Sequence, residues 1–283
     1  MRFFLRQRDG ERGMALVLVL LVLSVLTAMV VEFAYGIYVN TSLLNNWQRL
    51  QEISMAAESG ISIGSGFMKL ADSKSTYNTY RVLPVPPTDP FDIGIKVGVT
   101  VEEENSKLNI DMIIDDFGKN TKYYTALETL LDALDLKKVL AESIRDHIYS
   151  MGGGRTHFNS VEELLLVAGI DREVYNTLSP YVTVFGNGEI NINTAEKPVL
   201  MSLSGQMTEE MAQRVIEHRN ESPFKANKLN TVPGLEGVMV GLPQLSKGNT
   251  FSVTSKAMDE DGLVREIRCV MNNKGLILYW REL

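Results

Sequence analysis

Residue types that perform chemistry are sparse in this chain of 283 residues. The three histidines, His147, His157 and His218, have no His-x-x-x-His spacing, and none adjoins the single cysteine, Cys269. One cysteine can form neither an intramolecular disulfide framework nor a multi-cysteine zinc or iron–sulfur site. Motifs of a nucleophile elbow, a phosphate-binding loop or a metal hydrolase are absent from the sequence. We therefore predict a protein that is not an enzyme and that needs no cofactor.

Two carboxylate clusters offer oxygen ligands for a hard cation. Asp115–Asp116 and Glu102–Glu103–Glu104 place two or three carboxylates side by side. Neither cluster has the alternate spacing and the glycine of a calcium loop. We interpret both clusters as solvated turns.

The amino terminus contains a segment that could cross a membrane. Met14 to Val31 form a run of 18 residues without charge, and the 13 residues before it carry four arginines against two acidic residues. As a helix the run measures about 27 Å, which just spans a bilayer. The positive flank predicts a cytoplasmic amino terminus, with the rest of the chain on the far side of the membrane.

A small residue, Gly13, precedes the apolar run, whereas Val30 to Gly36 after the run match a secretory cleavage site poorly. The sequence Arg12–Gly13–Met14 resembles the site at which prepilin peptidase removes a short basic leader. We predict cleavage after Gly13, followed by N-methylation of Met14. A plain membrane anchor and a cleaved secretory signal remain alternatives.

Helical spacing continues beyond the apolar run. Apolar or small residues recur at steps of four and three, and no proline occurs before Pro84. The resulting seam consists of Leu43, Trp47, Leu50, Ser54, Ala57 and Ile61. We predict a helix over residues 14–60, ended by Gly60, Gly64 and Gly66, whose exposed seam at Leu43, Trp47 and Leu50 binds partner subunits.

Alternating apolar and polar residues predict a small antiparallel sheet. The alternation is strict from Asp92 to Glu102, and it returns over 251–257, 264–271 and 276–280, with turn sequences between these last three segments. Prolines 84, 86, 87 and 90 are interpreted as a linker before the first strand. Four strands against one long helix give an α+β fold class.

About 140 residues separate the first predicted strand from the other three, and they read as short helices. The predicted helices are 124–140, 143–149, 160–168, 172–178, 195–203 and 208–219, with Ser160 and Thr208 as N-caps. Gly152–Gly154 is interpreted as a linker. The predicted organisation is a leader (1–13), a spine helix (14–60), a pilin-like module (61–110 and 247–283) and an inserted all-α domain (111–246).

Part of the insert looks like a helix-hairpin-helix element, which raises the alternative of a DNA-binding protein. The turn Gly205–Gln206–Met207 lacks the second glycine that lets backbone N–H groups approach phosphate. Residues 111–240 hold 12 basic and 19 acidic side chains, and such a surface repels a polyanion. We therefore predict that the helical domain, similar to SAM and helix-hairpin-helix folds, binds no nucleic acid.

Taken in order, four segments resemble the K-type minor pseudopilin of the type II secretion system. They are Arg12 to Val31, Ser106 to Ile110, Ser160 to Leu164 and Ile190 to Ala195. The resemblance implies a subunit that initiates and caps the pseudopilus tip with I-, J- and H-type minor pseudopilins on an inner-membrane assembly platform. It also implies a single-pass inner-membrane protein with a periplasmic carboxyl-terminal domain. A minor pilin of a type IV pilus or of a DNA-uptake machine is the alternative.

Two departures from the pilin pattern bear on these expectations. Leu18 is the fifth residue after Gly13, where most pilins carry a glutamate that neutralises the amino terminus of the subunit ahead. Its absence is what the resemblance implies for a subunit at the tip. Members of the family carry an acidic loop near the Asp146 position, which implies Ca²⁺ binding, but only this one acid remains here. Bound Ca²⁺ stays an alternative to the absence of a cofactor, and no ligands are assigned.

Overall fold

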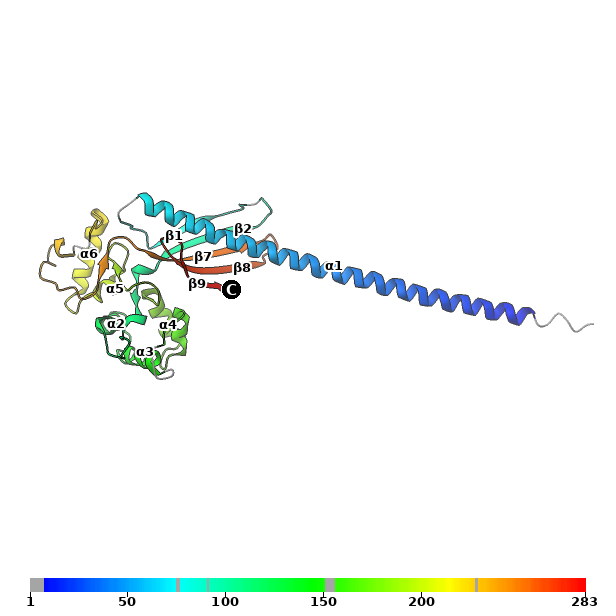
Figure 1. Cartoon of the computed structure of the whole chain (residues 1–283), viewed down its shortest axis with the longest axis horizontal. Helices are drawn as coiled ribbons and strands as arrows, with labels where there is room; N and C mark the ends of the chain where they lie inside the picture. The colour runs from blue at the N-terminus through cyan, green and yellow to red at the C-terminus, as the bar shows by residue number, and fades with distance from the viewer. Residues whose placement is uncertain (1–7, 75–76, 91, 151–155, 227–228) are drawn as a thin grey trace, which may run out of the picture. The chain divides into compact units, whose positions relative to one another are not determined.

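The computed structural model describes residues 8–74, 77–90, 92–150, 156–226 and 229–283. Its longest element is helix α1, Arg8–Lys74, of 67 residues (Figure 1). The stretch Gly13–Leu70 within it is long and apolar enough to cross a membrane. Contacts divide the chain into two units, Met1–Ser54 and Met55–Leu283, and α1 runs through the boundary.

The predicted end of this helix near residue 60 is wrong, because Gly60 and Gly64 have a packing role. A Cβ atom at Gly60 would overlap the side chain of Ser255, and one at Gly64 would overlap Val253. The two glycines therefore bring the helix backbone close to the sheet. Ala57, Ile61 and Met68 are buried on α1 as well, and this burial offsets the low helix propensity of glycine.

The sheet is antiparallel and has five strands in the order β1-β2-β7-β8-β9. The strands are β1 Val82–Thr88, β2 Lys96–Glu103, β7 Thr250–Met258, β8 Val264–Asn272 and β9 Ile277–Glu282. The four predicted strands are confirmed, but the prediction of a proline linker is wrong. Residues 82–88 form the edge strand β1, where proline is tolerated because one side of the strand has no neighbour.

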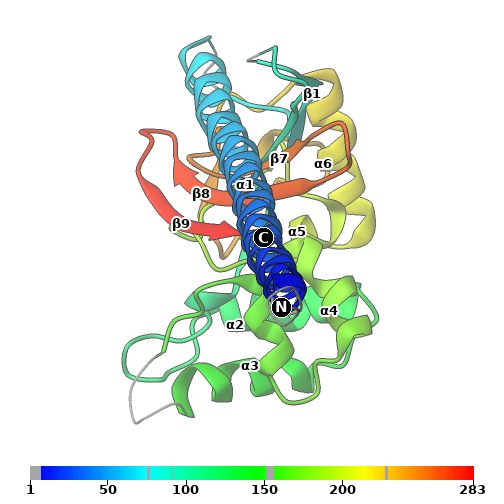
Figure 2. The ribbon, with the colours of Figure 1, turned by 90° about the vertical axis from the view of Figure 1, so that its right-hand side faces the viewer.

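In its described residues the insert has five α-helices and the 3-10 helix η3, which pack around their own core, together with shorter 3-10 turns. The α-helices and η3 are α2 Lys122–Ala133, α3 Val139–Ser150, η3 Val161–Leu166, α4 Arg172–Leu178, α5 Lys197–Met201 and α6 Glu209–Glu221. Figures 1 and 2 show α2, α3 and α4 gathered together, and α5 beside α6. Fully buried Leu127, Leu130 and Ile144 belong to one continuous apolar cluster.

Several details of the predicted insert change. The single helix expected over 124–140 breaks after Ala133, and Asp135 adopts a positive φ of 56° between α2 and α3. Thr208 caps α6 as predicted, because its hydroxyl accepts a hydrogen bond from the Met211 amide. Ser160 stands at the N-cap position of η3 but makes no capping hydrogen bond with its side chain. The Gly152–Gly154 run lies outside the described residues.

Short connecting elements complete the unit. Two parallel ladders of two residues each join β3 Leu108–Asn109 to β4 Val182–Thr183 and β5 Ile190–Asn191 to β6 Gln244–Leu245. Single 3-10 turns are η1 Glu104–Ser106, η2 Ile110–Met112, η4 Ser179–Tyr181 and η5 Leu229–Thr231. The α+β fold class is confirmed, with the ladders added to a mainly helical insert.

Candidate functional site: helix surface and sheet–insert junction

The residues predicted for processing lie within α1. Met14 is 69% exposed and Leu18 is 62% exposed. A Cβ atom at Gly13 would meet no other atom within 4 Å. Residues 1–7 of the predicted leader lie outside the described part of the chain. Cleavage after Gly13 and N-methylation of Met14 stay predictions.

The predicted partner surface consists of large apolar side chains on α1. Leu43 and Trp47 are 61% and 63% exposed, and Leu50 is 36% exposed. Farther along the same seam, Ala57 and Ile61 are buried. The seam is therefore mainly apolar, and its first part is open to solvent within the chain. An apolar helix stripe of this kind is typical of a surface that another helix covers.

Two of the motifs that carried the resemblance meet at the junction between sheet and insert. The chain leaves the sheet after β2 and enters the insert through Glu104–Leu108, and it returns through β6 to β7. Asn105 joins these two crossings: its amide donates to the Glu189 carbonyl, and its oxygen accepts from the Asn249 and Thr250 amides at 2.9 Å each. One buried side chain thus holds the outgoing and returning segments together.

Asn193 and Arg219 hold the second motif, Ile190 to Ala195, in place. The Asn193 side chain donates to the carbonyls of Phe224 and Ser246 and accepts from the Phe224 amide. Arg219, on α6, donates to the carbonyls of Ile192 and Ala195 at 3.0 and 2.6 Å. Burial lowers the pKa of this guanidinium from its ordinary value. The motif is therefore a structural connector of the insert.

The interpretation of Glu102–Glu104 as a solvated turn is wrong. Glu103 and Glu104 are each 1% exposed. Burial raises the pKa of Glu103 from 4.5 to about 7, and hydrogen bonds from Asn191 and Asn78 only partly oppose this effect. The strand alternation contained the missed signal: Val97, Val99 and Val101 face the core, and a period of two places Glu103 on the same face.

Ion pairs surround the junction. Lys107 is 5% exposed, and its Nζ lies 3.0 Å from Glu102 and 3.6 Å from Glu104. Arg81, at the start of the β1 region, pairs with Glu196 of the insert and donates to the Pro180 carbonyl at 2.6 Å. These contacts add charged bridges between the sheet and the insert.

The hairpin turn at Gly205 joins α5 to α6, as the helix-hairpin-helix resemblance predicts. The acidic residues around it are all exposed: Glu209, Glu210, Glu217 and Glu221. This turn therefore presents carboxylates to solvent, which disfavours contact with phosphate.

The titratable residues considered for metal binding or catalysis make packing, hydrogen-bond or ion-pair contacts within the fold. His157 bonds Asp111, His147 stacks on Phe158 with ring centroids 5.4 Å apart, and Asp146 pairs with Arg145. Cys269 is fully buried, and burial raises the pKa of its thiol to about 11, as fits a small apolar residue. Within the described ranges, no group of three or more His, Cys, Asp or Glu side chains could hold a metal ion.

Comparison with known proteins bears on the junction directly. Residues 190–247 match the family model for protein K of the type II secretion system (T2SS). The matched segment begins at β5 and ends in the chain that returns to the sheet. The resemblance to K-type minor pseudopilins is confirmed. Curated proteins gave no match to the chain.

The fold agrees with this family. The chain is similar to a chain in the crystal structure of the GspK-GspI-GspJ complex from the enterotoxigenic Escherichia coli Type 2 Secretion System. The TM-score is 0.58 at 14% identity, and the match covers 84% of this chain and 98% of that chain. The two chains therefore share a fold over most of their length.

Proposed function

We propose that the chain is a non-enzymatic minor pseudopilin that initiates and caps the tip of a type II secretion pseudopilus. The observation that carries the proposal is the family match over 190–247, a segment that begins at β5 and ends in the chain that returns to the sheet. A fold shared with a chain of the GspK-GspI-GspJ complex supports I- and J-type pseudopilins as partners. We include an H-type subunit and the inner-membrane assembly platform among the partners by the same family argument.

Membrane anchoring would come from the amino-terminal part of α1. The arginine-rich flank favours a cytoplasmic amino terminus, and the head would then lie in the periplasm. Prepilin peptidase would cut after Gly13 and leave Met14 as the methylated terminus. The apolar surface at Leu43, Trp47 and Leu50 would then be covered by helices of neighbouring subunits.

A tip position agrees with two features of the chain. Leu18 stands where most pilins carry a glutamate that neutralises the amino terminus of the subunit ahead. In a subunit with nothing ahead of it, that carboxylate would be unpaired in lipid, which is costly. The insert of about 136 residues enlarges the head beyond a pilin module, and a large head would clash with subunits above it inside a helical filament. Both features favour a subunit with nothing ahead of it.

The test is the position and number of copies in assembled filaments. The full-length chain, labelled at its carboxyl end, is expressed with the other pseudopilins, and sheared filaments are imaged. About one label at one end of each filament is the expected result, together with recovery of I- and J-type subunits from detergent-solubilised membranes. Labels at regular intervals along the filament would refute the tip assignment.

A further inference from the structure

Glu103 closes a ring of hydrogen bonds at the junction between the sheet and the insert. Asn191 donates to Oε1 of Glu103 at 2.7 Å and to Oδ1 of Asn78 at 2.8 Å. Asn78 donates to Oε2 of Glu103 at 2.7 Å and accepts from the Gly248 amide at 2.8 Å. These four residues, Glu103, Asn78, Asn191 and Gly248, are called the Glu103 junction.

The Glu103 junction joins four segments that are far apart in the chain. Glu103 is the last residue of β2, Asn78 follows α1, Asn191 belongs to β5 of the insert, and Gly248 lies between β6 and β7. A Cβ atom at Gly248 would overlap Oε1 of Glu103, so the returning chain passes directly against the carboxyl. Glu103 therefore contacts both crossings between sheet and insert, in addition to the hydrogen bonds that Asn105 makes there.

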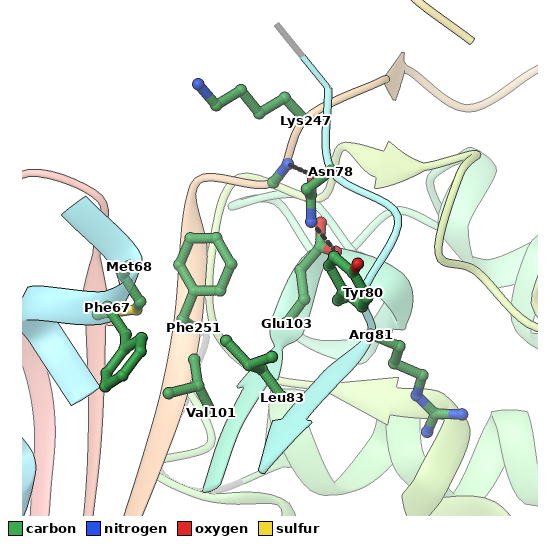
Figure 3. A pocket seen from close by; sticks show the side chains of 11 residues that line it. Phe67, Met68, Asn78, Tyr80, Arg81, Leu83, Val101, Glu103, Lys247 and Phe251 are labelled. Atoms are coloured by element: carbon green, nitrogen blue, oxygen red, sulfur yellow. Dashed lines mark hydrogen bonds between the residues drawn. The ribbon is translucent and has the colours of Figure 1, made fainter. Parts of the chain in front are cut away.

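A cavity of about 70 Å³ adjoins the carboxyl (Figure 3). Figure 3 shows Glu103 and Asn78 pointing toward one another at its polar end, with Phe67, Val101 and Phe251 on the apolar side. The cavity leaves room beside a carboxyl that is otherwise enclosed. A change in the hydration of Glu103 would therefore not need the core to be repacked.

Charged and titratable groups approach the Glu103 junction from each element packed against it. Tyr80, Arg81 and Lys247 line the cavity, and Glu104 and Lys107 follow Glu103 along the chain. Arg81 and Lys107 pair with other carboxylates, as described above. Among these described neighbours there is no histidine, and each oxygen of the Glu103 carboxyl accepts from a neutral amide.

Burial of Glu103 sets the direction in which pH changes the stability of the closed junction. The native chain holds a proton on Glu103 up to a pKa of about 7, whereas the ordinary value is 4.5. Between these values the closed junction binds more protons than an opened one, so closure weakens as pH rises. Ionisation places a charge on a side chain that is 1% exposed, and opening the junction would let bulk water solvate that charge.

We propose that the Glu103 junction is a proton-controlled latch that holds the insert to the sheet when Glu103 is neutral and releases both crossings when Glu103 is ionised. Contacts elsewhere would keep the insert attached in the released state. Glu162 of η3 pairs with Arg268 of β8 at 2.9 Å, and Phe185 lies against Tyr279 of β9. The insert would then move about these contacts without detaching.

The experiment measures amide hydrogen exchange of the full-length chain in detergent micelles from pH 5 to pH 8, corrected for the intrinsic effect of pH on exchange. The expected result is that opening at residues 190–193 and 246–249 increases about tenfold per pH unit up to pH 7 and then levels off, on the order of a hundredfold in total. Exchange in the core of α2 should not follow this profile.

Two variants distinguish the ionisation of Glu103 from the ionisation of other groups. Glu103→Gln cannot ionise and should show a flat profile at the same segments, whereas Glu104→Gln, at an equally buried neighbouring carboxyl, should keep the wild-type profile. The proposal is overturned if Glu103→Gln titrates like the wild type or if the wild type shows no pH dependence at the junction. If Glu103→Gln does not fold, the wild-type chain provides the test by itself. An increase in hydrogen exchange with pH that is as large in α2 as at the junction would also overturn the proposal.

Discussion

Truncating Asn191 should destabilise the head strongly, because this side chain serves three partners at once. Its amide donates to Glu103 and Asn78, and its oxygen accepts from the Asn193 amide at 3.0 Å. Asn191 is fully buried. In Asn191→Ala, the Asn193 amide loses its partner and the Glu103 carboxyl loses one of its donors.

The expected loss of stability can be estimated from these broken hydrogen bonds. A buried polar group left without its partner costs about 1–3 kcal/mol. Two groups are affected, so the free energy of unfolding should fall by about 2–6 kcal/mol. The hydrogen bond from Asn191 also lowers the pKa of Glu103. Its loss should therefore raise that pKa further.

The assay is pulse proteolysis of the full-length chain in detergent over a urea series. Asn187→Ala is the matched control, because Asn187 is an exposed asparagine that bonds only near itself, to Glu189. The control should change the free energy of unfolding by less than about 1 kcal/mol. If Asn191→Ala is no more destabilising than the control, the junction does not have the role described for it.

Three further predictions concern processing, assembly and nucleic acid. Gly13→Leu should leave a full-length precursor in cells that contain prepilin peptidase, and a mature amino terminus at Met14 in this variant would contradict the cleavage site. Trp47→Glu should reduce co-purification of partner pseudopilins several-fold, whereas Phe117→Glu, at another exposed aromatic residue, should not; equal losses would refute the helix surface. The full-length chain should bind neither DNA nor RNA at physiological salt, and micromolar, salt-sensitive binding in a fluorescence anisotropy titration would favour the DNA-uptake alternative.

Periodic features of the fold were predictable from local sequence. The strict alternation before Glu102 corresponds to β2, and the three carboxyl-terminal segments correspond to β7, β8 and β9. Thr208 was recognisable as a cap because an N-cap acts on amides only a few residues away. Such features depend on neighbours within one turn or one strand, which the sequence contains directly.

The ends of elements were less predictable. Gly60 and Gly64 looked like the end of a helix, but they are points at which a continuing helix approaches Ser255 and Val253. The prolines of β1 looked like a linker, but an edge position lets the strand that contains them pair with β2 on one side. In both cases tertiary contacts decided the outcome against local propensity.

The amino-acid sequence alone determined the apolar amino-terminal segment, the α+β class and the order of motifs that resembles K-type pseudopilins. These features can be recognised from the order of residues alone, because they depend on composition, period and spacing. The tertiary structure decided the state of Glu103 and the roles of Asn78 and Asn191, which lie 113 residues apart and share one hydrogen bond. A carboxyl in a charged run is solvated or buried according to which distant segments cover it, and only the folded chain brings those segments together.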